Sequence, residues 1–321
     1  MFLFTLHERE LFENWHFLPI AIQYVQAFYC ALASEVKNMK KPIVAIMYDF
    51  DKTLSTTDMQ NYGFIPTLGM TPDQFWGATG EFSKKTGCER ILSYMYMMIA
   101  LSKEKGVDLS RKSLNRMGSG IKYFPGVETW FKRINEYGKK RGVIVEHYLI
   151  SSGTKEIIEG CSIYKQFKQI FGCEFLFDEK SGQPIWPKLA VNYTQKTQYF
   201  FRISKGALDV TDDAKVNTKG VDHRVPYSNM IYMGDGMTDV PCMQLVKDNG
   251  GKSIAIFAKG NKDTIRTLLK GGRVNYACLA NYEDGSHLDT IVKAVIDNVA
   301  TNAVLRDQEE KIFKKEVGEK Q

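Results

Sequence analysis

Two aspartates directly after an apolar run constrain the fold of this chain more than any other feature. The run extends from Ile43 to Tyr48, and Asp49 and Asp51 follow it, with Thr53 two positions later. An uninterrupted apolar run of this length is typical of a buried strand in a parallel sheet. Ligands bind at the C-terminal ends of such strands, and Asp can act as a nucleophile in phosphoryl chemistry. Alone, the pattern also fits a polar turn that the two Asp residues cap.

A second acidic cluster repeats this pattern later in the chain. The apolar residues 231–233 lead into Gly234-Asp235-Gly236, and Asp239 follows. The glycines allow a tight turn, and a helix that starts near Met237 would keep both carboxylates near one site. Carboxylates from two strand ends suit Mg²⁺, which prefers oxygen ligands. An isolated Gly-Asp-Gly is more often a surface turn, so the predicted metal site depends on the pairing of the two clusters.

A third apolar run ends in small hydroxyl residues, and a lysine is expected near them. Tyr148 to Ile150 precede Ser151-Ser152-Gly153-Thr154, which offer hydroxyl and backbone N–H groups to a phosphate. A cation is needed where charge develops on a transferring phosphoryl group. Lys196 follows a predicted strand over 189–193 and opens a predicted helix. Lys205, at the far end of that helix, is the alternative.

Together these four stretches resemble the motifs of the haloacid dehalogenase (HAD) superfamily of hydrolases. The match is Asp-x-Asp-x-Thr, then a serine, a lysine and Gly-Asp-x-x-x-Asp in the family's order, over roughly residues 39 to 300. The resemblance implies an α/β fold, in which a Rossmann-like parallel sheet carries an inserted, mainly α-helical cap. An insertion between the first two motifs is similar to that of the phosphoserine-phosphatase-like members.

The resemblance also implies roles for the matched residues. Asp49 would be the nucleophile that becomes an aspartyl-phosphate, and Asp51 the general acid and base. Mg²⁺ would be held by Asp49, the backbone carbonyl of Asp51 and Asp235, with Asp239 in support. Thr53 would help to fix the loop, Ser151 would bind the phosphoryl oxygens, and Lys196 would neutralise charge between Asp49 and the phosphoryl group. Ser152 and Gly153 are further candidates for binding the substrate.

An Asp at position 51 narrows the implied reaction. Dehalogenases of the superfamily lack an Asp there, and phosphonatases carry a small residue. Asp51 would supply the proton that an alkoxide leaving group needs, a contribution worth about 10²–10⁴ in rate. We therefore expect an enzyme, a Mg²⁺-dependent phosphatase that hydrolyses a small-molecule phosphate monoester. A phosphotransferase and a non-catalytic regulatory or binding module of the same fold remain alternatives.

The segment between the first two motifs is expected to be the cap. Residues 57–122 have a helical pattern, and 89–103 is an uninterrupted helix candidate. The catalytic core would comprise 39–56 and 123–300, followed by a charged C-terminal tail over 301–321. A polar cap side chain is more often a surface group than a substrate contact. The candidate specificity residues are Asp58, Gln60, Arg90, Arg116 and Lys122. Asp58 lies shortly after the first motif, where related enzymes can place an acidic contact to a substrate amine.

Composition is ordinary for a globular protein and disfavours several partner classes. The chain has 321 residues, of which 25% are charged, and a net charge of +6. No basic stripe with interleaved aromatic residues is present, so we expect no nucleic-acid partner. The six cysteines form no Cys-x-x-Cys pair and the five histidines show no metal spacing. We expect free thiols in the cytoplasm and a small phosphorylated metabolite as partner, while the oligomeric state is not predicted.

The N-terminal 38 residues stand apart from the rest. Residues 14–34 contain no charged side chain, so their length alone would suit a membrane span. Pro19 and Gln23 within this run argue against a span, and residues 7–10, with two Glu and one Arg, are not the positively charged start of a signal peptide. Because the first core strand begins soon after Met39, we expect residues 1–38 to be a dispensable or non-native extension, without stable membrane association.

Overall fold

The structure, a computed structural model, describes residues 41–219, 223–260 and 263–318. The predicted extension over 1–38 lies outside the described residues. The chain divides into two compact units, and residues 42–300 form the unit that carries all four motifs. No helix in the described part of the chain is long and apolar enough to cross a membrane.

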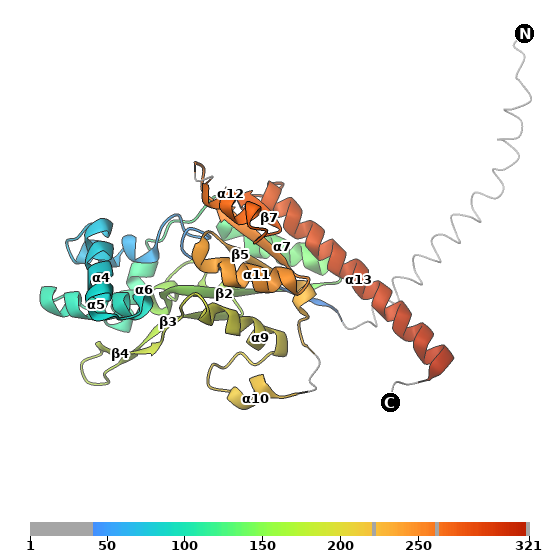
Figure 1. Ribbon diagram of the computed structural model, residues 1–321, viewed down its shortest axis with the longest axis horizontal. Coiled ribbons are helices and arrows are strands. Elements are labelled where there is room, and N and C mark those ends of the chain that lie inside the picture. Colours follow the sequence, from blue (N-terminus) through green and yellow to red (C-terminus); the bar gives the residue numbers. More distant parts are fainter. Residues whose placement is uncertain (1–40, 220–222, 261–262, 319–321) are drawn as a thin grey trace, which may run out of the picture. The chain divides into compact units, whose positions relative to one another are not determined.

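A seven-stranded sheet forms the centre of the unit 42–300 (Figure 1). Its strands are β1 (Ile43–Tyr48), β2 (Ile144–Thr154), β3 (Gln169–Phe177), β4 (Pro184–Leu189), β5 (Met230–Gly234), β6 (Lys252–Phe257) and β7 (Tyr276–Leu279). Their order is β4-β3-β2-β1-β5-β6-β7, and neighbours are parallel except for β3 and β4. The predicted α/β fold with a Rossmann-like parallel sheet is confirmed.

The position of β1 explains where a ligand can enter this sheet. Val44 to Met47 are fully buried, as the uninterrupted apolar run requires. The strand pairs with β2 on one side and with β5 on the other, so the order of the sheet reverses at β1. At such a reversal the loops after the two neighbouring strands diverge and leave a crevice at the C-terminal strand ends. Both acidic clusters therefore face the same crevice.

Helices pack on the strands of the unit 42–300. Helix α7 (Val127–Lys140) covers β2, and its fully buried Trp130 donates a hydrogen bond from Nε1 to the Tyr48 hydroxyl (2.8 Å). The other helices after β2 are α8 (Lys155–Ile158), α9 (Gln198–Lys205), α10 (Asp213–Asn217), α11 (Val240–Asp248), α12 (Asp263–Lys270) and α13 (His287–Val317). Helix α13 begins within the unit 42–300, and its residues from Thr301 onward belong to the second compact unit.

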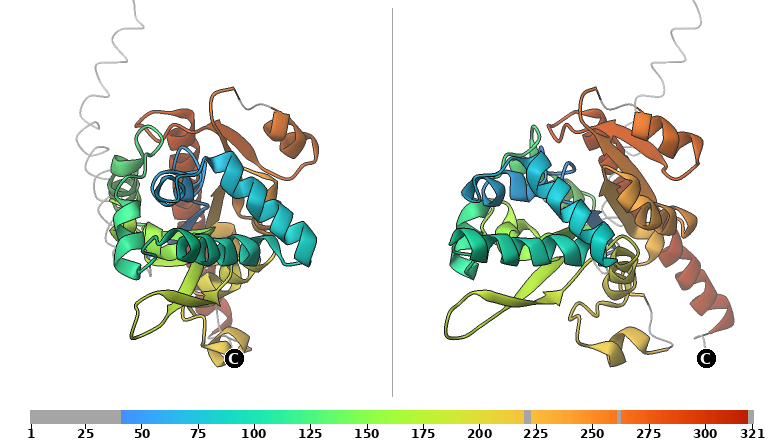
Figure 2. Two further views of the ribbon diagram at one scale, coloured as in Figure 1. Left: turned by 90° about the vertical axis from the view of Figure 1, so that its left-hand side faces the viewer. Right: turned by 60° about the vertical axis from the view of Figure 1, so that its left-hand side comes forward.

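Residues 57–122 form a group of helices, here called the helical insertion. These are the 3-10 helix η2 (Met59–Asn61) and the α-helices α3 (Phe64–Thr67), α4 (Pro72–Thr86), α5 (Arg90–Lys105) and α6 (Arg111–Gly118). Figure 1 shows α4, α5 and α6 together beside one end of the sheet, and the left view of Figure 2 shows them in front of the strands. The division of the chain into cap and core domains stays a prediction.

The two ends of the helical insertion run side by side. Ser55 and Tyr123 form an antiparallel bridge, and the Phe124 N–H donates to the Leu54 carbonyl (3.0 Å). Because these hydrogen bonds lie only a few residues after Asp49, the insertion begins and ends close to the first acidic cluster. Its helices are thus attached beside the crevice.

The strand predicted over 189–193 is wrong. Strand β4 ends at Leu189, and Lys196 instead lies in the 3-10 helix η4 (Gln195–Thr197) before α9. The reason is a local turn, in which the Asn192 side chain accepts a hydrogen bond from the Gln195 N–H (3.1 Å). Asn favours such turns because its side chain competes with strand pairing.

Candidate active site

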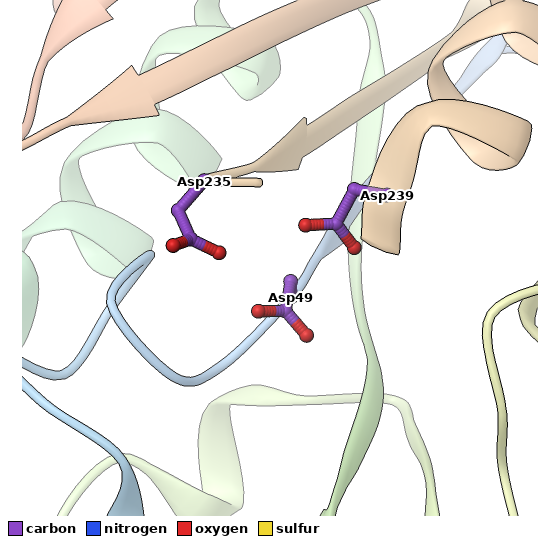
Figure 3. A group of neighbouring side chains, drawn as sticks. All are labelled: Asp49, Asp235 and Asp239. Atoms are coloured by element: carbon purple, nitrogen blue, oxygen red, sulfur yellow. The ribbon is translucent and has the colours of Figure 1, made fainter. Parts of the chain in front are cut away.

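Three carboxylates meet at the C-terminal ends of β1 and β5 (Figure 3). Asp49 directly follows β1, Asp235 directly follows β5, and Asp239 ends the 3-10 helix η6 (Met237–Asp239). One carboxylate oxygen of each residue lies within 4.8 Å of one from each of the others. The two acidic clusters, nearly two hundred positions apart in the chain, thus form one group of oxygen atoms.

Lys196 lies against this group of carboxylates. Its Nζ atom is 2.7 Å from Asp49 Oδ1 and 2.8 Å from Asp239 Oδ1, and the residue is only 2% exposed. Burial alone would lower the pKa of Lys196, but Asp239 and Asp49 outweigh it and raise that pKa above its usual value. Lys205 instead donates to two backbone carbonyls at the end of α10 (2.7 and 3.1 Å). The fold therefore brings Lys196, and not Lys205, to the carboxylates.

The carboxylates carry more negative charge than Lys196 can balance. Burial raises the pKa of Asp49 to about 6, with Lys196 opposing and Asp239 adding to the rise. Burial and repulsion from Asp49 and Asp239 raise the pKa of Asp235 to about 8. A further cation would relieve this repulsion, and a cluster of carboxylate oxygens suits a hard cation such as Mg²⁺.

Asp51 has an environment that favours its protonated form. Burial raises its pKa well above the usual value, and the nearby Asp58 and Asp49 raise it further. Its Oδ1 accepts a hydrogen bond from the Met59 N–H (2.8 Å), which holds the carboxyl group beside the insertion. A carboxyl group that keeps its proton near neutral pH is suited to general acid catalysis.

The predicted substrate contact Asp58 is paired within the protein. Its Oδ1 lies 2.9 Å from Nζ of Lys52, the residue after Asp51. Lys52 has a φ of 57°, in the left-handed region where residues other than glycine are uncommon. Because strained backbone of this kind clusters at functional sites, the Lys52 conformation agrees with a binding site in this loop.

The residues at the end of β2 differ in what their side chains contact. Ser151 is 1% exposed, and its Oγ accepts a hydrogen bond from the Gly153 N–H (2.9 Å). The Ser152 Oγ is buried without a hydrogen-bond partner among the described residues. Thr53 is fully buried, and its carbonyl accepts a hydrogen bond from the Tyr282 hydroxyl (2.8 Å). Thr53 thus ties the first loop to the chain after β7.

A pocket of about 710 Å³ joins these strand ends to the helical insertion. On the side of the sheet it is lined by the predicted residues Asp49, Asp51, Ser152, Gly153 and Asp235, and by Lys196 in η4. From the insertion it is lined by the predicted candidates Asp58, Gln60 and Arg90, but not by Arg116 or Lys122. The pocket is large enough for a small organic phosphate.

Sequence reasoning missed several residues that line this pocket. Trp76 and Thr79 on α4, and Ile91 and Tyr94 on α5, contribute side chains to it. Each pair is spaced three residues apart and so shares one face of its helix. That spacing is visible in the sequence, but it does not reveal which helix face meets the strand ends.

No protein-family model matches the sequence. An uncharacterized protein of Borreliella burgdorferi is 26% identical over 277 residues, which cover 78% of this chain and 95% of that protein.

Two solved structures have the same fold as this chain. A HAD family hydrolase from Salmonella enterica serovar Typhi has a TM-score of 0.50 and 15% identity, covering 81% of this chain and 72% of its own. A probable phosphoserine phosphatase from Vibrio cholerae has a TM-score of 0.50 and 14% identity, covering 83% of this chain and 67% of its own. The chain has the fold of the HAD hydrolases, as its motifs predict.

Proposed function

We propose that this protein is a Mg²⁺-dependent phosphatase that hydrolyses a small-molecule phosphate monoester through an aspartyl-phosphate on Asp49. The observation that carries the proposal is the buried Lys196 shared by Asp49 and Asp239, next to Asp235. An attacking carboxylate must be ionised, and with a pKa of about 6 Asp49 is largely ionised at neutral pH. A fold shared with HAD hydrolases supports the same chemistry.

The residues at the strand ends fit a magnesium ion. All three side chains offer carboxylate oxygens, and burial together with repulsion from Asp49 and Asp239 raises the pKa of Asp235 to about 8. Asp49, Asp235 and the backbone carbonyl of Asp51 would hold the ion, with Asp239 in support. Bound Mg²⁺ would supply positive charge to the phosphoryl oxygens.

The protein's own groups can carry the two steps of the reaction. In the first, a carboxylate oxygen of Asp49 attacks phosphorus, the phosphorus–oxygen bond of the ester breaks, and Asp51 gives its proton to the leaving alkoxide. In the second, Asp51 removes a proton from water, whose oxygen attacks phosphorus and releases phosphate from Asp49. The site is then restored, with Asp49 ionised and Asp51 protonated.

Other groups would stabilise the charge that moves in these steps. Lys196 neutralises Asp49 and the phosphoryl group as they approach each other. The Ser152 hydroxyl, buried without a partner among the described residues, would bind the phosphoryl oxygens, and Ser151 and the Gly153 backbone lie beside it. The described cysteines are free thiols, in agreement with the cytoplasmic location proposed from the sequence.

The test is phosphate release from p-nitrophenyl phosphate and a panel of small phosphate esters, with Mg²⁺ and with EDTA. We expect metal-dependent release that falls at least about 10³-fold in Asp49→Asn, because the amide is a poor nucleophile. Asp248→Asn, the same change at an exposed position of α11, is the matched control. Circular dichroism of both variants checks that the fold is retained.

Three results would count against the proposal in different ways. Substantial activity in Asp49→Asn would remove Asp49 as the nucleophile. Transfer of the phosphoryl group to an added alcohol in preference to water would indicate a phosphotransferase. If the folded wild-type protein releases no phosphate from any ester of the panel, a non-catalytic module would be favoured.

A further inference from the structure

Two buried polar side chains of the helical insertion line the pocket without a hydrogen-bond partner among the described residues. Gln60, in η2, is 2% exposed and its Oε1 is unpartnered; Thr79, in α4, is 6% exposed and its Oγ1 is unpartnered. Leaving a buried amide or hydroxyl group unpaired lowers the stability of the fold, so native proteins rarely do it without a reason. Both groups are therefore candidates for binding a ligand.

Thr79 differs from other threonines in the helices of this chain. Thr67, Thr86 and Thr290 each donate from Oγ1 to the carbonyl three or four residues earlier, at 2.6, 2.7 and 3.0 Å. Such a bond satisfies the hydroxyl within its own helix. Thr79 lies in the middle of α4, where the same bond is available, yet its hydroxyl has no such partner. Its hydroxyl is thus not satisfied within its own helix.

Two aromatic side chains, Trp76 and Tyr94, line the same pocket as Gln60 and Thr79. Trp76 Nε1 already donates to Asn61 Oδ1 (3.2 Å), and the Tyr94 hydroxyl already donates to the Ser152 carbonyl (2.7 Å). The two rings stand edge to face, with their centres 6.1 Å apart. Because their polar atoms are engaged, they contribute carbon surface to the pocket that Gln60 and Thr79 also line, and the Gln60 Oε1 and Thr79 Oγ1 atoms have no partner among the described residues. This combination suits a molecule with C–H faces and hydroxyl edges.

The charges in the pocket favour an uncharged group at this position. Gln60 and Thr79 are neutral, and Asp58 is already paired with Lys52 at 2.9 Å. A charged group buried beside Gln60 and Thr79 would lack a counter-ion, which is unfavourable. Arg90, the other charged residue that the insertion contributes to the pocket, is exposed to solvent. An amine or carboxylate is therefore a poorer match to the buried subsite than a hydroxyl.

We propose that Gln60 and Thr79 form a subsite for the hydroxyl groups of the alcohol part of the substrate, which makes sugar and polyol phosphates the substrate class. The subsite deepens the proposed phosphatase function and rests on it. The Gln60 amide and the Thr79 hydroxyl bind substrate hydroxyls, while Trp76 and Tyr94 pack against its carbon atoms. The phosphoryl group lies at the strand ends.

The first test compares esters that differ only in hydroxyl groups. Wild-type kcat/KM is measured for glycerol 3-phosphate against propyl phosphate, and for glucose 6-phosphate against cyclohexylmethyl phosphate, with O-phosphoserine as a charged ester. For at least one hydroxylated ester, we expect kcat/KM to be at least about tenfold higher than for the matching alkyl ester and for O-phosphoserine. The reason is that a site that hydrogen-bonds a hydroxyl discriminates against substrates without it. Equal or better use of the alkyl esters, or of O-phosphoserine, overturns the inference.

The second test removes the two groups with little change of shape. Thr79→Val and Gln60→Leu should each reduce the preference for the hydroxylated over the alkyl ester by roughly three- to tenfold. Ser102→Ala is the matched control, since the buried Ser102 hydroxyl also has no partner in the described part of the chain, but Ser102 does not line the pocket. Its preference ratio should equal that of the wild type.

The outcomes separate this inference from the function on which it rests. The subsite is overturned if the ratio of kcat/KM between the hydroxylated and the alkyl ester stays at the wild-type value in both variants. It is also overturned if kcat/KM falls by the same factor for every ester. Release from p-nitrophenyl phosphate without any preference for hydroxylated esters overturns the subsite and leaves the phosphatase intact. Absence of release from every ester overturns both.

Discussion

At the scale of single residues, Lys196 offsets part of the repulsion between the buried carboxylates at the strand ends. Its ammonium group is the cation shared by Asp49 and Asp239, at 2.7 and 2.8 Å. We expect Lys196→Ala to lower kcat/KM for phosphate esters about 10²–10³-fold, because it removes a preorganised charge at the reacting group. Steady-state kinetics on p-nitrophenyl phosphate with saturating Mg²⁺ measure the loss.

Lys205→Ala is the matched control for this substitution. It removes a lysine nine positions later, whose Nζ contacts only backbone carbonyls of the α10 region in the described structure. We expect its kcat/KM to stay close to the wild-type value. A larger loss in Lys205→Ala than in Lys196→Ala would move the catalytic lysine to position 205.

Single residues also show where sequence reasoning reaches its limit. The residues Asp49, Asp51 and Asp235 could be predicted because strand ends of a parallel sheet converge, whatever the details of the loops. The sequence favours Lys196 over Lys205 without settling the choice, since both flank the same helix, and only the folded chain shows Lys196 at the carboxylates. Thr79 was missed because nothing in its sequence neighbourhood marks its hydroxyl as unpartnered.

At the scale of secondary-structure elements, α6 of the helical insertion packs unusually close to α8. A Cβ atom at Gly118 would lie 2.0 Å from the Ile157 carbonyl oxygen, a distance that backbone atoms cannot tolerate. The contact is reinforced by an ion pair between Arg111 and Glu159 (2.7 Å). This packing ties the insertion to the chain after β2, and so helps to set the width of the pocket.

The close packing predicts opposite effects for two Gly→Ala substitutions in helices. Gly118→Ala should lower the free energy of unfolding by about 1–3 kcal/mol, because the new methyl group overpacks the α6–α8 contact. Gly77→Ala, in α4 with open space around it, should raise this free energy by about 0.5–1 kcal/mol through better helix propensity. Urea unfolding followed by circular dichroism measures both, and equal stabilities would show that α6 and α8 are not in close contact.

At the scale of the whole molecule, the parallel sheet was the most predictable feature. The ends of its edge strand β4 were the least predictable. The buried strands β1 and β5 are apolar runs that few other structures could accommodate. Strand β4 pairs only with β3, and exposed residues such as Trp186 make its pattern irregular. An edge strand is constrained on one side only, so its sequence predicts its ends poorly.

The interior of the molecule contains a histidine that makes its stability depend on pH. His147, on β2, is 2% exposed; its Nδ1 lies 2.9 Å from the Tyr48 hydroxyl and its Nε2 3.2 Å from Asn135 Oδ1. The neutral ring satisfies both partners, as Nε2–H donates to Asn135 and Nδ1 accepts from Tyr48. Burial lowers the pKa of His147 to about 3, against about 6.5 in an unfolded chain.

The unfolded state therefore binds one more proton than the folded state between about pH 3 and 6.5. By linkage, the contribution of His147 to stability is complete above pH 6.5 and is lost as the pH falls, with a slope of up to about 1.4 kcal/mol per pH unit. We expect His147→Leu to flatten the dependence of the unfolding free energy on pH between 4 and 6.5 by up to this amount. Urea unfolding at several pH values measures this slope, and an unchanged slope in His147→Leu would show that this histidine is not the source of acid sensitivity.

Tyr48→Phe is the control for this prediction. It removes the hydrogen bond to His147 but leaves the imidazole ring of His147 buried, so it should lower the free energy of unfolding without changing the slope.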